Sequence, residues 1–192
     1  MSDTRRAGMI DAVIKIGGAL VREPGALDAA ARAIVTAARS HRLLIVPGGG
    51  PFADAVRAID RDSGLTADAA HWMAILGMEQ YAHLLVGRMN GARLVACGEE
   101  IRAALDAAAL PVLAPYRWLR AADPLPHSWD VTSDSIAAWV AGAVGARTLV
   151  LIKPVAGSVA SLVDAYFARA VPAQLRVIAV VATDVGDLES LL

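Results

Sequence analysis

The sequence predicts an α/β protein in which helices cover both faces of a mainly parallel central sheet, as a three-layer α/β/α sandwich. Short apolar runs alternate with longer helical patterns, which predicts βα units. The short runs are continuously apolar, as is typical of strands buried on both faces. Hydrophobic residues make up 56% of the chain and charged residues only 19%, so much of the chain must be buried.

Six strands and six helices are expected. Strands are predicted at residues 12–16, 43–46, 93–96, 111–114, 148–152 and 176–181, where the runs are rich in leucine or β-branched residues. Helices are predicted at residues 26–39, 51–62, 67–89, 99–108, 133–144 and 159–168. Residues 111–126 hold four prolines and show no clear period after their first strand. A length of 192 residues suits one domain with a substantial core, so residues 1–192 are expected to form a single domain.

Helix 67–89 carries apolar residues around most of its circumference, whereas a surface helix needs only one apolar stripe. The helix can therefore lie inside the core, or it can lie at the interface of a homo-oligomer. The low share of charged residues favours burial of this helix, but it does not distinguish a core helix from a helix at a homo-oligomer interface. A homo-oligomer, a dimer or larger, is kept as a prediction.

Composition and charge argue against several classes of protein. A net charge of −1 provides no electrostatic surface for nucleic acid or an anionic membrane. The longest uncharged stretch, residues 135–146, has 12 residues against the roughly 20 that span a bilayer. The single cysteine, Cys97, excludes an intrachain disulfide and fits a reducing compartment. The polar N-terminus shows no targeting segment, so a cytoplasmic protein is expected.

The first predicted strand ends in a glycine turn. Lys15 is followed by Gly17 and Gly18, and glycines at such a place let a phosphate approach the backbone. Taken alone, a Gly-Gly pair after a strand is better explained by a tight turn.

A second glycine turn, Pro47-Gly48-Gly49-Gly50-Pro51, joins a strand to a helix. Backbone amides at a helix N-terminus can bind an anion, and three glycines remove all side-chain bulk. A flexible loop is the alternative, but the flanking prolines stiffen the turn and favour the anion site. Neither turn matches the P-loop pattern GxxxxGK[ST] or the dinucleotide pattern GxGxxG.

Lysine is rare in this chain. Of 18 basic residues only Lys15 and Lys153 are lysine, and both stand at the ends of apolar strands. A charge at such a place is costly without a partner, and a compact ammonium group suits a phosphate. Chance placement is the alternative explanation.

Residues 128–138 place carboxylates before a helix that Thr132 or Ser133 would cap. Asp130 and Asp134 face the same space if the turn continues through them, and could then hold Mg²⁺ or orient phosphate-binding lysines. Compensation of the helix dipole explains Asp134 equally well. The four histidines lack the spacing of zinc sites, so no metal held by the protein alone is expected.

Together and in this order, these segments resemble the amino-acid-kinase superfamily over about residues 10–157. The resemblance implies ATP and Mg²⁺ as cofactors and a small-molecule phosphoryl acceptor. The catalytic residues that it implies are Lys15, Asp134 and Lys153. The nucleotide-binding residues that it implies are Gly17, Gly18, Lys153 and Gly157, and the acceptor-binding residues are Gly48, Gly49 and Gly50.

The expected reaction is direct in-line phosphoryl transfer. Arg57 and Arg117 are candidates for binding an acceptor phosphate, because arginine forks onto phosphate oxygens, and Asp130 is a third acceptor-binding candidate. For each arginine, an ordinary surface role is the more common explanation.

Residues 70–75, 115–117 and 125–129 are similar to kinases that act on [5-(aminomethyl)furan-3-yl]methyl phosphate in methanofuran assembly. That similarity implies a phosphomonoester acceptor that becomes a diphosphate. It also implies a role in methanofuran-like cofactor biosynthesis within one-carbon metabolism.

The chain departs from the superfamily at two places. Residues 154–157 lack the aspartate of its V-D-G sequence, and no Gly-Gly-Met-x-x-Lys segment follows Gly157. These departures predict a shortened C-terminal nucleotide-binding part, and they support a protein of the same fold that binds nucleotide or an oxyanion without turnover. A kinase for a carboxylate or carbamate acceptor is a further alternative. Retention of Lys15 and Lys153 favours catalysis.

Overall fold

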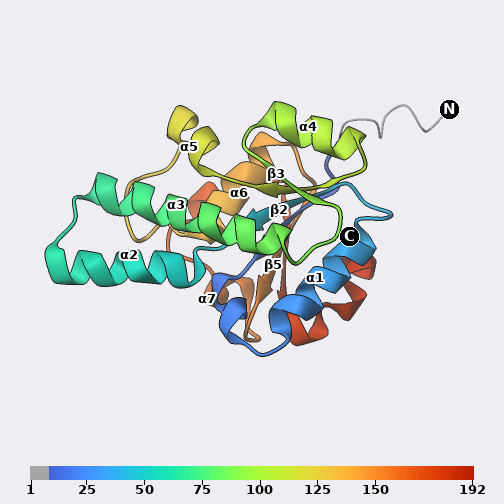
Figure 1. Ribbon diagram of the computed structural model, residues 1–192, viewed down its shortest axis with the longest axis horizontal. Coiled ribbons are helices and arrows are strands. Elements are labelled where there is room, and N and C mark those ends of the chain that lie inside the picture. Colours follow the sequence, from blue (N-terminus) through green and yellow to red (C-terminus); the bar gives the residue numbers. More distant parts are fainter. Residues whose placement is uncertain (1–8) are drawn as a thin grey trace.

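A six-stranded sheet forms the centre of the protein, in a computed structural model that describes residues 9–192. The strand order is β3–β4–β2–β1–β5–β6, and every neighbouring pair is parallel. Helices lie on both faces of the sheet (Figure 1), which confirms the predicted α/β/α sandwich. The strands are β1 (Ala12–Ile16), β2 (Leu43–Pro47), β3 (Ala92–Val95), β4 (Leu110–Leu113), β5 (Thr148–Lys153) and β6 (Arg176–Val181).

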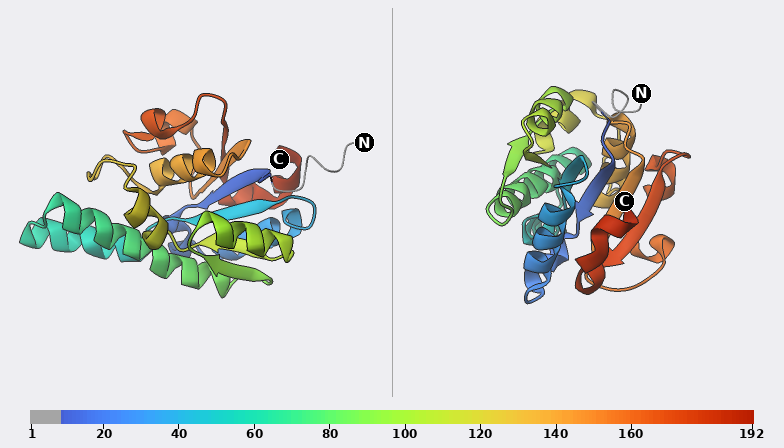
Figure 2. Two further views of the ribbon diagram at one scale, coloured as in Figure 1. Left: turned by 90° about the horizontal axis from the view of Figure 1, so that it is seen from above. Right: turned by 90° about the vertical axis from the view of Figure 1, so that its right-hand side faces the viewer.

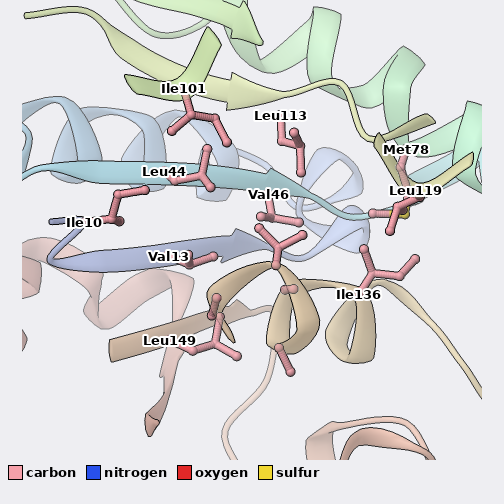
Figure 3. Close-up of a cluster of buried hydrophobic side chains, with 14 of the residues drawn as sticks. Ile10, Val13, Leu44, Val46, Met78, Ile101, Leu113, Leu119, Ile136 and Leu149 are labelled. Carbon is pink, nitrogen blue, oxygen red and sulfur yellow. The ribbon is translucent and has the colours of Figure 1, made fainter. Parts of the chain in front are cut away.

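The central strands are apolar at every position because both of their faces are buried. Alternate side chains of β1, β2 and β5 enter two separate hydrophobic clusters. Figure 3 shows the first cluster, in which Val13, Leu44 and Leu149 pack with Ile136 of helix α6. Lys15 lies two residues after Val13 in β1, and Lys153 lies four residues after Leu149 in β5. Because side chains alternate between the faces of a sheet, both lysine side chains point to the face of this first cluster.

Helices divide between the two faces. On the face of the first cluster lie α4 (Gly98–Asp106), α5 (Tyr116–Ala122), α6 (Ser133–Ala143) and α8 (Phe167–Ala170). On the other face lie α1 (Ala26–Ala37) and the 3₁₀ segments η1 (Gly18–Arg22) and η2 (Ala182–Leu191). A short helix, α7 (Val159–Leu162), follows β5. Within residues 9–192, no helix combines the length and the apolar character needed to cross a membrane.

Helices α2 (Gly50–Ser63) and α3 (Ala67–Val86) lie side by side and project beyond the sheet (Figures 1 and 2). The two helices approach closely at Gly77, where an added Cβ atom would lie 3.0 Å from the backbone nitrogen of Ala53 and would push that backbone away by a few tenths of an ångström. Thr66 begins α3 by accepting a hydrogen bond from the Ala69 amide. The pair forms one wall of the cavity described below.

Helix α3 is buried mainly within its own chain. Ile75 and Met78 belong to the first hydrophobic cluster, while Tyr81 and Leu85 belong to the second. Its unusual apolar circumference is thus largely explained by packing against both clusters. Leu76 stays 41% exposed, and the homo-oligomer remains a prediction.

Two predicted elements differ from the structure. The helix predicted at residues 159–168 is wrong, because the chain there breaks into α7 and α8 around Asp164, whose carboxylate turns to the start of α6. Residues 111–126, which showed no period, contain helix α5. That helix has only seven residues and buries Leu119 alone, so it leaves no periodic pattern to detect.

Candidate active site

Lys15, Lys153 and Asp134 meet at the carboxyl end of the sheet. Lys15 and Lys153 come from neighbouring strands β1 and β5, and Asp134 lies in the first turn of α6. The Nζ atom of Lys15 is 2.8 Å from Oδ1 of Asp134, and that of Lys153 is 2.7 Å from Oδ2. The structure thus brings together the three residues that the sequence suggested as catalytic.

Two buried ammonium groups share a single carboxylate, so this cluster carries one positive charge in excess. The three side chains are only 5%, 10% and 6% exposed. Burial by itself raises the pKa of Asp134, but the two lysines outweigh burial and hold that pKa below its usual value. Burial, together with repulsion from Lys15, lowers the pKa of Lys153 although Asp134 opposes the change. An anion placed here would relieve that repulsion.

The two lysines differ in their hydrogen bonds. Lys153 donates to Oδ2 of Asp134 and also to the carbonyl oxygen of Leu162, at 2.6 Å. Lys15 is close to Oδ1 of Asp134, but that oxygen receives no aligned hydrogen bond within residues 9–192. Asp134 is the one polar partner of Lys15 within residues 9–192, and an ammonium group has three N–H donors, so Lys15 keeps donors for an additional acceptor.

Asp164 holds the start of α6 and was not identified from the sequence. Its carboxylate accepts hydrogen bonds from the amides of Thr132 and Ser135, each at 3.0 Å, and from both of their hydroxyl groups. A carboxylate at this place satisfies unpaired amides and complements the helix dipole. Asp164 therefore fixes the turn that presents Asp134 to the lysines. The only sequence signal was a polar residue inside an apolar pattern.

The two glycine turns contact each other at the ends of β1 and β2. A Cβ atom on Gly18 would lie 2.1 Å from the nitrogen of Gly50, and one on Gly48 would lie 2.4 Å from the nitrogen of Gly18. Gly50 also has φ of +54°, which favours glycine. Packing alone therefore requires glycine at these positions. The carbonyl oxygen of Gly17 accepts a hydrogen bond from the buried Tyr81 hydroxyl at 3.4 Å.

A cavity of about 600 Å³ opens beside the glycine turns, between the α2–α3 pair and the loop that leads into α6. Gly18, Gly49 and Gly50 line one part of it, next to Thr132 and Ser133, which directly precede Asp134. The remaining lining is partly apolar and partly charged. Its polar side chains include Asp54, Arg57, Asp60, His71, His127, Ser128 and Trp129.

Arg57, Asp60 and Trp129 form a cluster in this cavity. The Arg57 guanidinium lies over the Trp129 ring, 4.2 Å from its centre. The indole N–H of Trp129 donates to Oδ2 of Asp60 at 2.7 Å. Arg57 was a candidate from the sequence, whereas Asp60 and Trp129 were not assigned a role there.

Two histidines stack at the cavity wall, with ring centres 4.1 Å apart. His127 lies between Asp68 and Asp123, 2.6 Å and 2.9 Å away, and the hydrogen bond to Asp68 raises its pKa. Burial, reinforced by the neighbouring His127, lowers the pKa of His71 to about 4. At neutral pH His71 is therefore an uncharged imidazole.

Three predicted site residues lie away from this cavity. Arg117 on α5 is 69% exposed and pairs with Glu100, and the exposed Asp130 is not part of the lining. The structure brings neither of them to the larger cavity, because both side chains are exposed at the surface. Gly157 lines a different cavity of about 340 Å³ beyond β5 and β6, together with Val181 and Asp184.

A divalent cation at this site would need phosphate oxygens of a bound nucleotide as most of its ligands. In the part of the chain that the structure describes, no group of three or more histidine, cysteine or acidic side chains is arranged so that it could hold a metal ion. Asp134 is already engaged by two lysines. Mg²⁺ commonly binds through one or two carboxylates plus substrate phosphates, so the residues present fit a metal that arrives with a nucleotide.

Comparison with known proteins agrees with this geometry. The model of the amino acid kinase family matches residues 12–157. The chain is 27% identical over 151 residues to the [5-(aminomethyl)furan-3-yl]methyl phosphate kinase of Methanocaldococcus jannaschii, and the aligned part covers 76% of this chain and 66% of that protein. The chain therefore spans about two thirds of the length of this relative.

Solved structures of two kinases share the fold. The uridylate kinase of Archaeoglobus fulgidus superposes with a TM-score of 0.59 and 18% identity, over 77% of this chain and 65% of that one. The UMP kinase of Ureaplasma parvum gives 0.57 and 17%, over 77% and 70% of the two chains.

Proposed function

Because the chain belongs to the amino acid kinase family, we propose that it is a kinase that transfers the γ-phosphoryl group of ATP to a phosphomonoester acceptor. The observation that carries this proposal is the buried cluster of Lys15, Lys153 and Asp134, with two ammonium groups for one carboxylate. A buried excess of positive charge is costly unless an anion binds there. Phosphate is the anion that the neighbouring glycine turns can also accommodate.

Each residue of the cluster has a definite part in such a transfer. In-line phosphoryl transfer depends on positioned reactants and neutralised charge more than on covalent chemistry. Lys15 and Lys153 neutralise charge on the transferred group, and Asp134 holds both ammonium groups in place. The first amides of α2, at Gly49 and Gly50, are donors for its oxygens. Mg²⁺ bound to the nucleotide supplies further neutralisation of the phosphate charge.

The nucleotide is expected on the β5–β6 side of the lysines. Gly17 lies beside Ile152 and Lys153 of β5. Gly157 lines the cavity of about 340 Å³ beyond β6, whereas Gly18 lines the larger cavity. That volume lies within the usual range for small-molecule pockets. Residues 1–192 would then act as a single domain with a reduced nucleotide-binding part.

The larger cavity, beyond Gly48, Gly49 and Gly50, is the proposed acceptor site. The relative from Methanocaldococcus jannaschii is named for [5-(aminomethyl)furan-3-yl]methyl phosphate. We take the same compound, or a close analogue in a methanofuran-like cofactor pathway, as the acceptor here. Arg57, held against Trp129, is the arginine placed to contact it.

Phosphorus NMR tests the proposal directly. Protein, ATP and Mg²⁺ would be incubated with [5-(aminomethyl)furan-3-yl]methyl phosphate, and with a carboxylate and carbamate in parallel. We expect a diphosphate product to appear in step with ADP for the phosphomonoester only. Transfer to the carboxylate or carbamate would reassign the acceptor class. ATP binding without turnover of any acceptor would replace the kinase with a nucleotide-binding protein of the same fold.

A further inference from the structure

The acceptor cavity contains one carboxylate that has no cationic partner. Two acidic residues line the cavity, Asp54 and Asp60. Asp54 pairs with Arg22 at 2.8 Å. Asp60 forms no ion pair within residues 9–192, although it is half-buried. Its negative charge therefore faces the cavity without a partner from the described chain.

Neutral donors hold the Asp60 carboxylate in one orientation. The Trp129 indole donates to Oδ2 at 2.7 Å, and the Leu65 amide donates to Oδ1 at 2.9 Å. Each carboxylate oxygen can accept a second hydrogen bond, so both keep acceptor capacity. Such an arrangement prepares the carboxylate for a charged donor while leaving its charge in place.

The cationic and titratable side chains of the cavity form no ion pair with Asp60 in the described part of the chain. The Arg57 guanidinium lies over the face of the Trp129 ring, whereas Asp60 binds the N–H at the edge of the same ring. His127 is held between Asp68 and Asp123. His71, which also lines the cavity, is uncharged at neutral pH and can accept a hydrogen bond through one ring nitrogen.

We infer that Asp60, oriented by Trp129 and assisted by His71, binds a protonated amine of the phosphoryl acceptor. This inference rests on the proposed function, in which the acceptor phosphate lies at the lysines. Gly18, Gly49 and Gly50 line one part of the cavity and Asp60 lines another, which suits a molecule with a phosphate at one end and an ammonium group at the other. Between them the lining is apolar, with Ala70, Ala74, Ile75 and Met78. The preferred acceptor is therefore an amino-substituted phosphomonoester with a compact apolar body.

Two acceptors that differ only in the amine test this inference. [5-(aminomethyl)furan-3-yl]methyl phosphate would be compared with (5-methylfuran-3-yl)methyl phosphate in the wild-type protein, in Asp60→Asn and in Asp62→Asn. Asp62 is the matched control, since it is an exposed carboxylate on the same helix and outside the cavity lining. Loss of a charge-assisted hydrogen bond should lower kcat/KM at least about tenfold more for the amine acceptor than for the methyl acceptor in Asp60→Asn. Asp62→Asn should lower both equally or not at all.

Equal losses for the two acceptors in Asp60→Asn, or no wild-type preference for the amine, would overturn the amine site while leaving the kinase intact. Absence of transfer to either acceptor would instead contradict the proposed function. Calorimetry with each acceptor alone gives a readout that does not need turnover. There, Asp60→Asn should weaken binding of the amine acceptor selectively. Trp129→Phe, which removes the donor that orients Asp60 but keeps an aromatic ring, should weaken it less; an unchanged affinity in both variants would refute the inference.

Discussion

Replacing Asp134 should destabilise the protein far more than replacing Lys153, because the cluster has two ammonium groups and one carboxylate. Asp134→Asn leaves two buried ammonium groups without a carboxylate. Lys153→Met leaves one ammonium group, Lys15, paired with one carboxylate. The first change increases the uncompensated charge, and the second removes it.

The magnitudes follow from burial. The three side chains are at most 10% exposed, so solvent screens their charges little. Removing the only partner of a buried charge costs about 3–5 kcal/mol, which we expect for Asp134→Asn. Lys153→Met loses the hydrogen bond to the Leu162 carbonyl, worth about 1–1.5 kcal/mol, and gains relief from desolvation and from repulsion by Lys15. Its free energy of unfolding should therefore stay within about 1–2 kcal/mol of the wild-type value.

Urea unfolding and thermal melting of the ligand-free proteins measure the difference. For a chain of this size, Asp134→Asn should melt about 6–20 °C below the wild type. Lys153→Met should melt close to the wild type, but should lose most of the stabilisation that ATP with Mg²⁺ gives to the wild type. Equal destabilisation by the two changes, or wild-type stability of Asp134→Asn, would refute the claim that the buried cluster carries one uncompensated positive charge.

Further changes test other parts of the account. Asp164→Ala should lower the free energy of unfolding by about 0.5–2 kcal/mol and also lower kcat, because the start of α6 loses the acceptor of two amides and Asp134 loses its orientation, although Thr132 remains the N-cap. Urea unfolding and initial rates measure the two effects, and a loss of stability with unchanged kcat would show a purely structural role. Gly18→Ala should prevent or severely weaken folding, since the new Cβ would overlap the Gly50 backbone, and a wild-type melting temperature would contradict that packing. The pKa of His127 is raised in the folded protein, so protonated His127 contributes its full stabilisation below the unfolded pKa near 6.5 and loses it as pH rises through the higher folded pKa. The difference in melting temperature between the wild type and His127→Asn should therefore shrink from pH 6 to pH 9. A difference that stays constant over this range would contradict the role of the protonated imidazole. Sedimentation at micromolar concentration should show a dimer or larger, and a monomer would leave α3 as a core helix alone.

The sheet and the lysines could be predicted because their signals are local. Continuous apolar runs follow directly from strands buried on both faces, and a lysine at the end of such a run is conspicuous in a chain that otherwise uses arginine. Parallel strands bring their carboxyl ends to one edge of the sheet, which is why lysines near the ends of β1 and β5 lie close together. The role of Asp134 came from the family resemblance, and the 2.7 Å and 2.8 Å contacts agree with it.

Asp164 and Asp60 could not be predicted because their partners are distant in sequence. Asp164 accepts hydrogen bonds at the start of α6, some thirty residues earlier in the chain, and it lies between α7 and α8, where the sequence predicted one continuous helix. Asp60 owes its orientation to Trp129, a contact across 69 positions. Neither pairing leaves a periodic or spaced pattern. Arg117 was a candidate because of its residue type alone, and the structure shows it exposed, outside the larger cavity and paired with Glu100 of α4.

The central claim is that the Lys15 ammonium group neutralises charge on a transferred phosphoryl group. Its most direct test is the kcat of Lys15→Ala with ATP, Mg²⁺ and [5-(aminomethyl)furan-3-yl]methyl phosphate, measured on protein whose fold is verified by circular dichroism. Removal of one preorganised donor to transition-state charge should lower kcat at least about 100-fold. A folded Lys15→Ala variant with near-normal kcat would contradict the claim.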